Sequence, residues 1–450
     1  MHRALWRAAG ALAVAFAAAP LVAQAPAKVP IERYTLDNGL TVILAEDHSA
    51  QVVAVDVWYD VGSRNEAINR TGFAHLFEHM MFQGSENVKK AEHFQYIQRA
   101  GGSMNGSTAE DRTNYFQALP SNRLNLGLWL EADRMRSLAV TDSNFANQRE
   151  AVKEERRLRV DNQPYGSAIF EHSYAIYDST TCFPYSHSVI GSMDDLNAAK
   201  TADVQAFFDM YYAPNNATLV VAGDFQPAEA KKLIQQYFAG IPRGTTPPPV
   251  ECNATFNSGA RVKHVHDAQA NLPASIKVYR VPAYDHADYA ALELLATIFG
   301  QGESSRLNRE LVRENKAAVQ AVTLLNPFGP RRGPGVFLNL AIANQGVKLD
   351  SVDALVAKQI AGLVSGGVTD EELTKAKNIY RANAINSRQM ALQLAESLQR
   401  ATMFLGSPEA LNTELARYDA VTVEDIRRVA RTYLTPENSL TLLVSSEVIQ

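Results

Sequence analysis

The sequence is poor in cysteine, because Cys182 and Cys252 are the only two among 450 residues. A disulfide-rich scaffold is therefore excluded, and the two thiols either form one disulfide or stay free. Basic residues are not in excess either, since 43 Lys and Arg stand against 48 Asp and Glu, a formal net charge of −5. That balance argues against a nucleic-acid-binding protein.

Long apolar runs are also scarce in this chain. One run, residues 8–22, follows Arg3 and Arg7 and is followed by small residues around Ala25. This order is typical of a secretory signal, so we expect residues 1–27 to be a signal peptide and the protein to be exported to the periplasm. A single uncleaved membrane anchor is the alternative interpretation.

The rest of the composition is that of a globular protein, with 46% hydrophobic and 20% charged residues. At this length we expect at least two cores. Asn38-Gly39 lies between alternating apolar segments, which predicts a hairpin over residues 34–44. Helical and strand-like periodicities then alternate, so the predicted class is α+β. Expected helices lie near residues 72–82, 91–99, 123–136, 145–159 and 202–210, and expected strands near residues 52–61, 113–119 and 218–222.

A proline-rich segment, residues 244–253, predicts an extended linker between a first half, residues 28–243, and a second half, residues 254–450. A faint repeat with an offset of 222 residues supports this division. The repeated positions are Asp203, Tyr211, Pro214 and Asn216, which recur as Asp425, Tyr433, Pro436 and Asn438. We therefore expect two related halves, each a mixed or antiparallel sheet packed with helices.

Chemistry concentrates in the apolar segment 71–82, where His75, Glu78 and His79 form an H-x-x-E-H pattern. On a helix the two histidines lie about 40° apart, so both imidazoles can reach one ion. Two histidines and a glutamate in apolar surroundings are costly to bury without partners. The pattern predicts a metal site, and the alternative is a pair of hydrogen-bonded histidines beside a salt-bridged glutamate.

A catalytic zinc ion needs a third protein ligand. The expected helix 145–159, with an N-cap near Asp142 or Ser143, places Glu155 on its apolar stripe with Val152 and Leu158. From the spacing alone, Glu155 is either this ligand or half of an exposed ion pair with Arg159.

With these residues the chain resembles the pitrilysin or insulinase family of metallopeptidases, the inverzincins, in which a glutamate ligand follows H-x-x-E-H after some 76 residues. The resemblance covers nearly the whole chain after the signal segment. It includes Asn38-Gly-Leu-Thr-Val, Gly101-Gly-Ser-Met-Asn-Gly-Ser-Thr, Tyr212-Ala-Pro-Asn-Asn and Phe299-Gly-Gln-Gly-Glu-Ser-Ser-Arg-Leu. It implies Zn²⁺ held by His75, His79 and Glu155, with Glu78 as the general base in peptide-bond hydrolysis.

The resemblance also implies how substrate is held. The strand around Asn105 and Gly106 is similar to the edge strand that pairs with an extended peptide in this family. An ordinary sheet edge is the alternative. The family usually has a glutamate seven residues before the ligand, and here Gln148 stands there, which predicts an uncharged residue near the metal site.

The second half departs further from the family pattern. It has no H-x-x-E-H, and Val319 occupies the place where a substrate-holding tyrosine is expected. Single-chain relatives are about twice as long, so this chain is most similar to the zinc-bearing subunit of bacterial two-subunit enzymes. We expect a heterodimer with a related subunit that supplies Arg and Tyr, with a homodimer as the fallback. Alternatives to a peptidase are a non-catalytic core subunit and a peptide- or zinc-binding protein without turnover.

Overall fold

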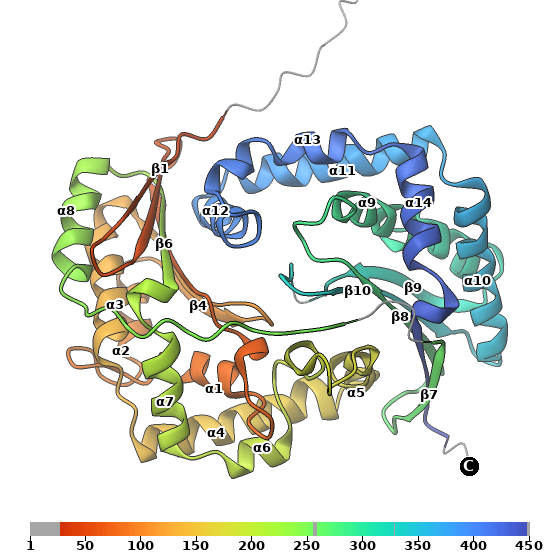
Figure 1. Ribbon diagram of the computed structural model, residues 1–450, viewed down its shortest axis with the longest axis horizontal. Helices are drawn as coiled ribbons and strands as arrows, with labels where there is room; N and C mark the ends of the chain where they lie inside the picture. Colours follow the sequence, from red (N-terminus) through yellow and green to blue (C-terminus); the bar gives the residue numbers. More distant parts are fainter. Residues whose placement is uncertain (1–27, 255–258, 328, 448–450) are drawn as a thin grey trace, which may run out of the picture.

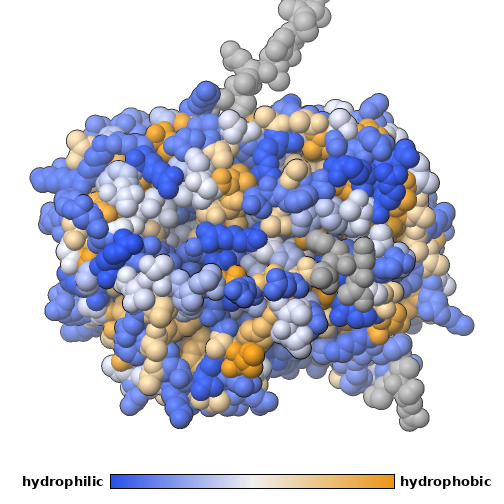
Figure 2. All heavy atoms as spheres, viewed as in Figure 1, coloured by the Kyte–Doolittle hydropathy of each residue, from blue (hydrophilic) through white to orange (hydrophobic). Residues whose placement is uncertain are grey.

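The computed structural model describes residues 28–254, 259–327 and 329–447 (Figure 1). The expected signal segment, residues 1–27, lies outside the described residues. In the part of the chain that is described, every helix is too short or too polar to cross a membrane. The face seen in Figure 2 is mainly hydrophilic, with hydrophobic residues scattered across it.

Six strands form the first sheet, in the order β1-β2-β6-β3-β5-β4. Neighbouring strands run antiparallel except β2 and β6, which are parallel. The strands are β1 (Glu32–Thr35), β2 (Thr41–Glu46), β3 (Val52–Tyr59), β4 (Ser103–Thr108), β5 (Thr113–Pro120) and β6 (Ala217–Gly223). The predicted hairpin is β1 and β2, but its turn is longer than the two-residue type, and Gly39 has a positive φ of 94° whereas Asn38 does not.

Helices α1, α3, α4, α7 and α8 share one hydrophobic core with one face of this sheet. The helices of the first half are α1 (Phe73–Met80), α2 (Glu92–Arg99), α3 (Leu124–Ser137), α4 (Asp142–Arg156), α5 (Gly166–Phe170), α6 (Met193–Ala198), α7 (Thr201–Tyr211) and α8 (Pro227–Phe238). Residues 242–254 then run without helix or strand toward the second sheet (Figure 1).

Five strands form the second sheet, in the order β7-β11-β8-β10-β9. They are β7 (Arg261–His266), β8 (Ala274–Val281), β9 (Ala318–Leu325), β10 (Gly335–Ala343) and β11 (Ser439–Ser445). The helices of this half are α9 (Tyr289–Gly300), α10 (Leu349–Gly366), α11 (Asp370–Ser387), α12 (Ala391–Leu405), α13 (Glu414–Asp419) and α14 (Val423–Tyr433).

The two sheets have the same topology. The order β2-β6-β3-β5-β4 in the first corresponds to β7-β11-β8-β10-β9 in the second, and β7 and β11 form the second sheet's parallel pair. Three elements begin 222 residues after their counterparts: β8 after β3, α14 after α7, and β11 after β6. The α+β fold with two related halves is therefore confirmed.

The two halves exchange helical segments. From the second half, α12 covers the remaining face of the first sheet, where Leu394 and Leu398 pack against Ile43 and Val220. In return, the segment around Ile176 joins the core of the second sheet. The predicted halves, residues 28–243 and 254–450, therefore each contribute a segment that packs against the sheet of the other half.

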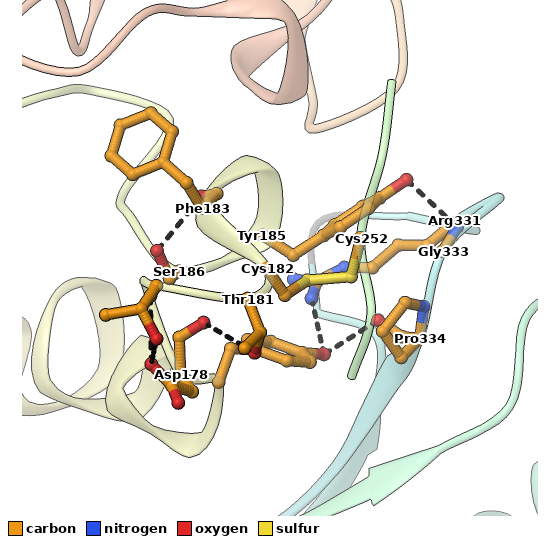
Figure 3. The surroundings of a disulfide bond; sticks show 12 residues. Asp178, Thr181, Cys182, Phe183, Tyr185, Ser186, Cys252, Arg331, Gly333 and Pro334 are labelled. Atoms are coloured by element: carbon orange, nitrogen blue, oxygen red, sulfur yellow. Dashed lines mark hydrogen bonds between the residues drawn. A yellow bond between two sulfur atoms is a disulfide. The ribbon is translucent and has the colours of Figure 1, made fainter. Parts of the chain in front are cut away.

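A disulfide (Figure 3) and a buried ion pair tie this seam together. Cys182 is bonded to Cys252, so the linker is fixed to the first half. Close by, the Arg331 side chain pairs with Glu110, and both side chains are only 1% exposed. Glu110 lies between β4 and β5, so the tip of that hairpin is held by the loop between β9 and β10.

Candidate metal centre

Helix α1 carries the H-x-x-E-H residues, and its N-terminus is fixed by a buried carboxylate. Glu66 accepts hydrogen bonds from the backbone N–H groups of Gly72 and Ala74, each at 2.8 Å. Burial raises the pKa of Glu66 well above its usual value, and these two hydrogen bonds partly offset the shift. Phe73, Leu76, Phe77 and Met80 face the core. The opposite side of the helix, with His75, Glu78 and His79, is left to face the cavity described below.

Helix α4 brings Glu155 to the two histidines. Thr141 is its N-cap and accepts a hydrogen bond from Asn144, so the expected caps Asp142 and Ser143 are wrong by one or two positions. The Oε2 atom of Glu155 lies 3.1 Å from Nε2 of His79 and 3.7 Å from Nε2 of His75. Its Oε1 atom lies 3.0 Å from Arg159, so Glu155 forms the predicted ion pair and also lies beside both histidines.

The electrostatics of this group follow from burial and from one hydrogen bond. Burial and, to a smaller extent, the neighbouring His79 lower the pKa of His75 to about 4. The hydrogen bond from His79 lowers the pKa of Glu155 to about 2. Burial alone would lower the pKa of His79, but its bond to Glu155 and the charge of Glu78 raise it above the usual value.

The donor set fits a zinc ion. Two imidazole nitrogens and one carboxylate oxygen, from His75, His79 and Glu155, all lie within 4.8 Å of one another. Zinc is commonly held by such a combination of histidine and carboxylate ligands in catalytic sites. The Nδ1 atom of His75 is buried and has no hydrogen-bond partner among the described residues. The Nε2 atom on the other side of that ring faces Glu155.

Glu78 lies against the edge strand β4. Thr108 donates a hydrogen bond of 2.6 Å to its Oε2 atom. Burial raises the pKa of Glu78, and the bond from Thr108 partly offsets this. The close approach depends on Gly106, because a Cβ atom there would lie 3.1 Å from Cγ and 3.2 Å from Oε1 of Glu78. A carboxyl group with a raised pKa beside an edge strand is suited to exchange protons with a bound substrate.

These groups open into one cavity of about 580 Å³. It is lined by His75, Glu78, His79, Phe82, Gln83, Phe94, Asn105, Gly106, Ser107, Thr108, Gln148, Glu155 and Arg159. All seven site residues expected from the sequence are therefore in one place. Gln148 also interacts with His79, as its position two turns before Glu155 suggested.

Thr108 and Arg159 were not identified as site residues from the sequence. The sequence indicates Arg159 only as an ion-pair partner of Glu155. No sequence motif indicates that the hydroxyl of Thr108 contacts Glu78. The contact depends on how β4 packs against α1. The Gly-Ser-Thr run after Asn105 was the signal that could have pointed to a strand close to the helix.

The second half has no comparable set of ligands. Thr297 and Gln301 stand 222 residues after His75 and His79, on α9 and at its C-terminal end. Val319, which occupies the place of the expected tyrosine, is 48% exposed on β9. Within the described residues, His75, His79 and Glu155 form the one group suited to hold a metal ion.

Comparison with known families gives two matches that together span most of the chain. The family described as Insulinase (Peptidase family M16) matches residues 41–179, which include every residue of the candidate centre. The one described as Peptidase M16 inactive domain matches residues 199–380.

Individual relatives agree with these matches. A zinc protease of Helicobacter pylori, PqqE, is 32% identical to this chain over 417 residues, which cover 92% of each protein. A crystal structure of a protease from Helicobacter pylori has a TM-score of 0.88 at 30% identity, covering 93% of this chain and 100% of that one. Pitrilysin has a similar fold, with a TM-score of 0.74 at 19% identity, and this chain spans 45% of its length.

Proposed function

Because this chain belongs to the insulinase family of peptidases, peptidase family M16, we propose that it is a zinc-dependent peptidase that hydrolyses peptides or unfolded polypeptides. The observation that carries the proposal is the convergence of His75, His79 and Glu155 within 4.8 Å, with Glu78 in the same cavity. Relatives named zinc proteases, such as PqqE of Helicobacter pylori, support the choice of metal.

The residues have separable roles in this proposal. His75, His79 and Glu155 hold the zinc ion, which when bound supplies a Lewis acid and lowers the pKa of water to about 7. Glu78 accepts the proton of the attacking water and returns a proton to the leaving amine. Thr108 holds one oxygen of Glu78 in place, which leaves the other oxygen for proton transfer. Gln148 contacts His79 without adding charge.

The edge strand β4 is the proposed binding place for the substrate backbone. It is the last strand of the first sheet, and both Asn105 and Gly106 line the cavity. An extended peptide that pairs with β4 gains main-chain hydrogen bonds whatever its side chains. Its carbonyl groups would pass beside Glu78, which is suited to a peptidase with broad sequence tolerance.

We further propose that the active enzyme encloses its substrate in a chamber formed with a second, related subunit. This chain spans about half of pitrilysin, and its own second half lacks the tyrosine expected at Val319. A related subunit could supply the missing Arg and Tyr, and a homodimer is the fallback. Native mass spectrometry of the protein purified from its host should show a heterodimer, whereas a fully active monomer would contradict the proposal.

We propose a periplasmic location on the basis of the leader, residues 1–27, and of the Cys182–Cys252 disulfide. Disulfides persist mainly in oxidising compartments. Fractionation of the host, with detection of the mature N-terminus by mass spectrometry, tests both cleavage and export. Recovery of the uncleaved chain in the cytosol would overturn this part of the proposal.

The direct test of the chemistry is Glu78→Gln. We expect peptide hydrolysis to fall by about 10²–10⁴-fold, the usual contribution of a general base, while zinc content stays at one ion per chain. Glu150→Gln is the matched control, because Glu150 is exposed on the same helix as Glu155 and pairs with Lys153. Unchanged activity in Glu78→Gln would refute the role of Glu78. A zinc-loaded wild-type protein that is inactive with and without its partner would instead indicate a non-catalytic core subunit.

A further inference from the structure

A second cavity, of about 360 Å³, lies at the seam between the two halves and takes no part in the proposed reaction. Its walls come from α9, α11, α12 and the loops next to β8 and β9, and α12 is the helix that covers the first sheet (Figure 1). We call it the seam cavity and define it by Tyr284, Tyr289, Glu293, Asn326, Tyr380 and Arg400.

Arg400 is the unusual residue of the seam cavity. It projects from α12 toward Glu293, Glu414 and two tyrosines, and their charges raise its pKa although burial opposes this. Yet Arg400 makes no hydrogen bond or salt bridge with any described residue, whereas the buried Arg331 and Arg134 each pair with a glutamate. A guanidinium group carries five donors in a planar fork that matches a carboxylate. The N–H donors of Arg400 are therefore available to a ligand in the cavity.

The acidic groups near Arg400 differ in their availability. Glu414 is 4% exposed and accepts a hydrogen bond of 2.8 Å from Tyr284, and it does not line the cavity. Glu293 does line it, and only its Oε2 atom is occupied, by a hydrogen bond of 2.6 Å from Tyr418. Its Oε1 atom has no hydrogen-bond partner in the described part of the chain. The cavity thus presents one free cationic fork and one free carboxyl oxygen.

The other walls are partly aromatic or aliphatic and partly polar, the polar residues being Asn326, Asn383 and Ser387. The rings of Tyr284 and Tyr289 lie 4.7 Å apart, and Tyr380 is stacked on Tyr418. Leu325 and Ala384 add aliphatic surface. Such walls accommodate an apolar or aromatic side chain between rings. Burial raises the pKa of Glu293, and the charge of Arg400 partly offsets this. Arg400 would oppose a purely cationic ligand, so complementarity favours a molecule with a carboxylate for Arg400 and an ammonium group for the free oxygen of Glu293.

We infer that the seam cavity binds a free amino acid or short peptide with an apolar side chain, with its carboxylate on Arg400 and its ammonium group on Glu293. The inference rests on the seam cavity alone and holds whether or not the metal centre is catalytic.

The test is titration calorimetry of the whole protein with L-phenylalanine and with the dipeptide L-alanyl-L-phenylalanine, before and after removal of bound metal. We expect saturable binding of at least one probe with the same affinity in both states. L-Phenylalaninamide and N-acetyl-L-phenylalanine, which each lack one charge, should bind at least about tenfold more weakly. Absence of binding by both probes would overturn the inference, as would binding that disappears with the metal.

Variants at two positions locate the site. Arg400→Gln should weaken binding by at least about tenfold, and Arg400→Lys should retain part of the affinity that Arg400→Gln loses. Glu293→Gln should selectively weaken binding of the probes that carry a free ammonium group. Arg123→Gln is the matched control, because Arg123 is exposed at the start of α3. Full affinity in both Arg400→Gln and Glu293→Gln would overturn the inference. If Arg400→Gln does not fold, the comparison of charged and capped probes on the wild-type protein still decides it.

Discussion

At the scale of single residues, the proposed base depends on a glycine on the facing strand. Gly106→Ala places a methyl group about 3.1 Å from Cγ of Glu78, which is closer than ordinary contact, so the carboxyl group must move. We expect kcat to fall by roughly tenfold with unchanged zinc content, since a small displacement of a catalytic group is costly. Steady-state kinetics measures this. Gly240→Ala is the control, because a Cβ atom there meets nothing within 4 Å.

A second residue, Asp56, is fully buried in the middle of β3, away from solvent. Its Oδ1 atom accepts a bond of 3.2 Å from Asn114, and its Oδ2 atom has no hydrogen-bond partner among the described residues. Burial and the charge of Glu396 raise its pKa well above the usual value. The folded protein therefore retains a proton that the unfolded chain releases, and the free energy of unfolding decreases as pH rises above about 4.

Asp56→Asn removes this titration. At neutral pH we expect the free energy of unfolding to increase, because the neutral amide is buried without taking up a proton. Urea unfolding between pH 5 and pH 8 should also show a weaker pH dependence for the variant. Asp37→Asn, at an exposed position, should leave both quantities unchanged. A destabilised Asp56→Asn protein would show that the Asp56 carboxylate is ionised and paired in the fold.

The sequence predicted part of the site because some contacts are local. His75, Glu78 and His79 lie on one helix, so their spacing alone places them together. Glu155 could be assigned to a helical stripe, but its distance from His79 depends on the packing of α1 against α4. Thr108, Arg400 and the free oxygen of Glu293 depend on contacts between distant segments, which periodicity does not reveal.

At the scale of elements, α12 belongs to the second half of the sequence and stabilises the first sheet. Leu398 lies on this helix, and its side chain is fully buried against strand residues such as Val220. Leu398→Ala should lower the free energy of unfolding by about 2–5 kcal/mol through loss of buried surface and formation of a cavity. Trp58 and Trp129 are the tryptophans among the described residues, and both lie in the first half.

Tryptophan fluorescence therefore reports on the first sheet and, through the contact of Trp58 with Phe404 of α12, on its packing against that helix. We expect the urea midpoint measured by fluorescence to fall in Leu398→Ala, and to stay unchanged in Leu158→Ala, where the side chain is 56% exposed. If circular dichroism showed a loss of stability that fluorescence did not, α12 would be stabilising only the second sheet.

Most helices and strands could be predicted from periodicity, since their apolar faces repeat with the expected spacing. One local prediction failed for a physical reason. Leu158 was assigned to the apolar stripe of α4, but the helix passes into a π-helical turn, η3 (Arg157–Asp161), and Leu158 faces solvent. The wider turn changes the angle between successive residues, which a constant period of 3.6 does not include.

At the scale of the whole molecule, the disulfide restrains the linker between the two halves. Cys182 and Cys252 are 70 residues apart, and a loop of this length predicts about 4 kcal/mol of stabilisation through the unfolded state. Reduction should therefore lower the urea midpoint. In the variant with both Cys182→Ala and Cys252→Ala, reductant should have no further effect. An equal midpoint for oxidised and reduced wild-type protein would show that the seam contacts alone hold the linker.

The repeated topology explains how one fold carries two different halves. The same strand order positions α1 in the first half and α9 in the second, but only α1 carries metal-ligating residues. The sequence revealed the repeat at a few positions, whereas the exchange of helical segments between halves could not be predicted, because it depends on which sheet each helix reaches in space.

The central claim is that His75, His79 and Glu155 hold one zinc ion. A crystal structure of the zinc-loaded protein, with anomalous diffraction recorded on both sides of the zinc absorption edge, tests it most directly. We predict one strong anomalous peak per chain, about 2.0–2.2 Å from a nitrogen of each histidine and an oxygen of Glu155. A peak elsewhere, or a Glu155 carboxylate that stays away from the ion, would contradict it.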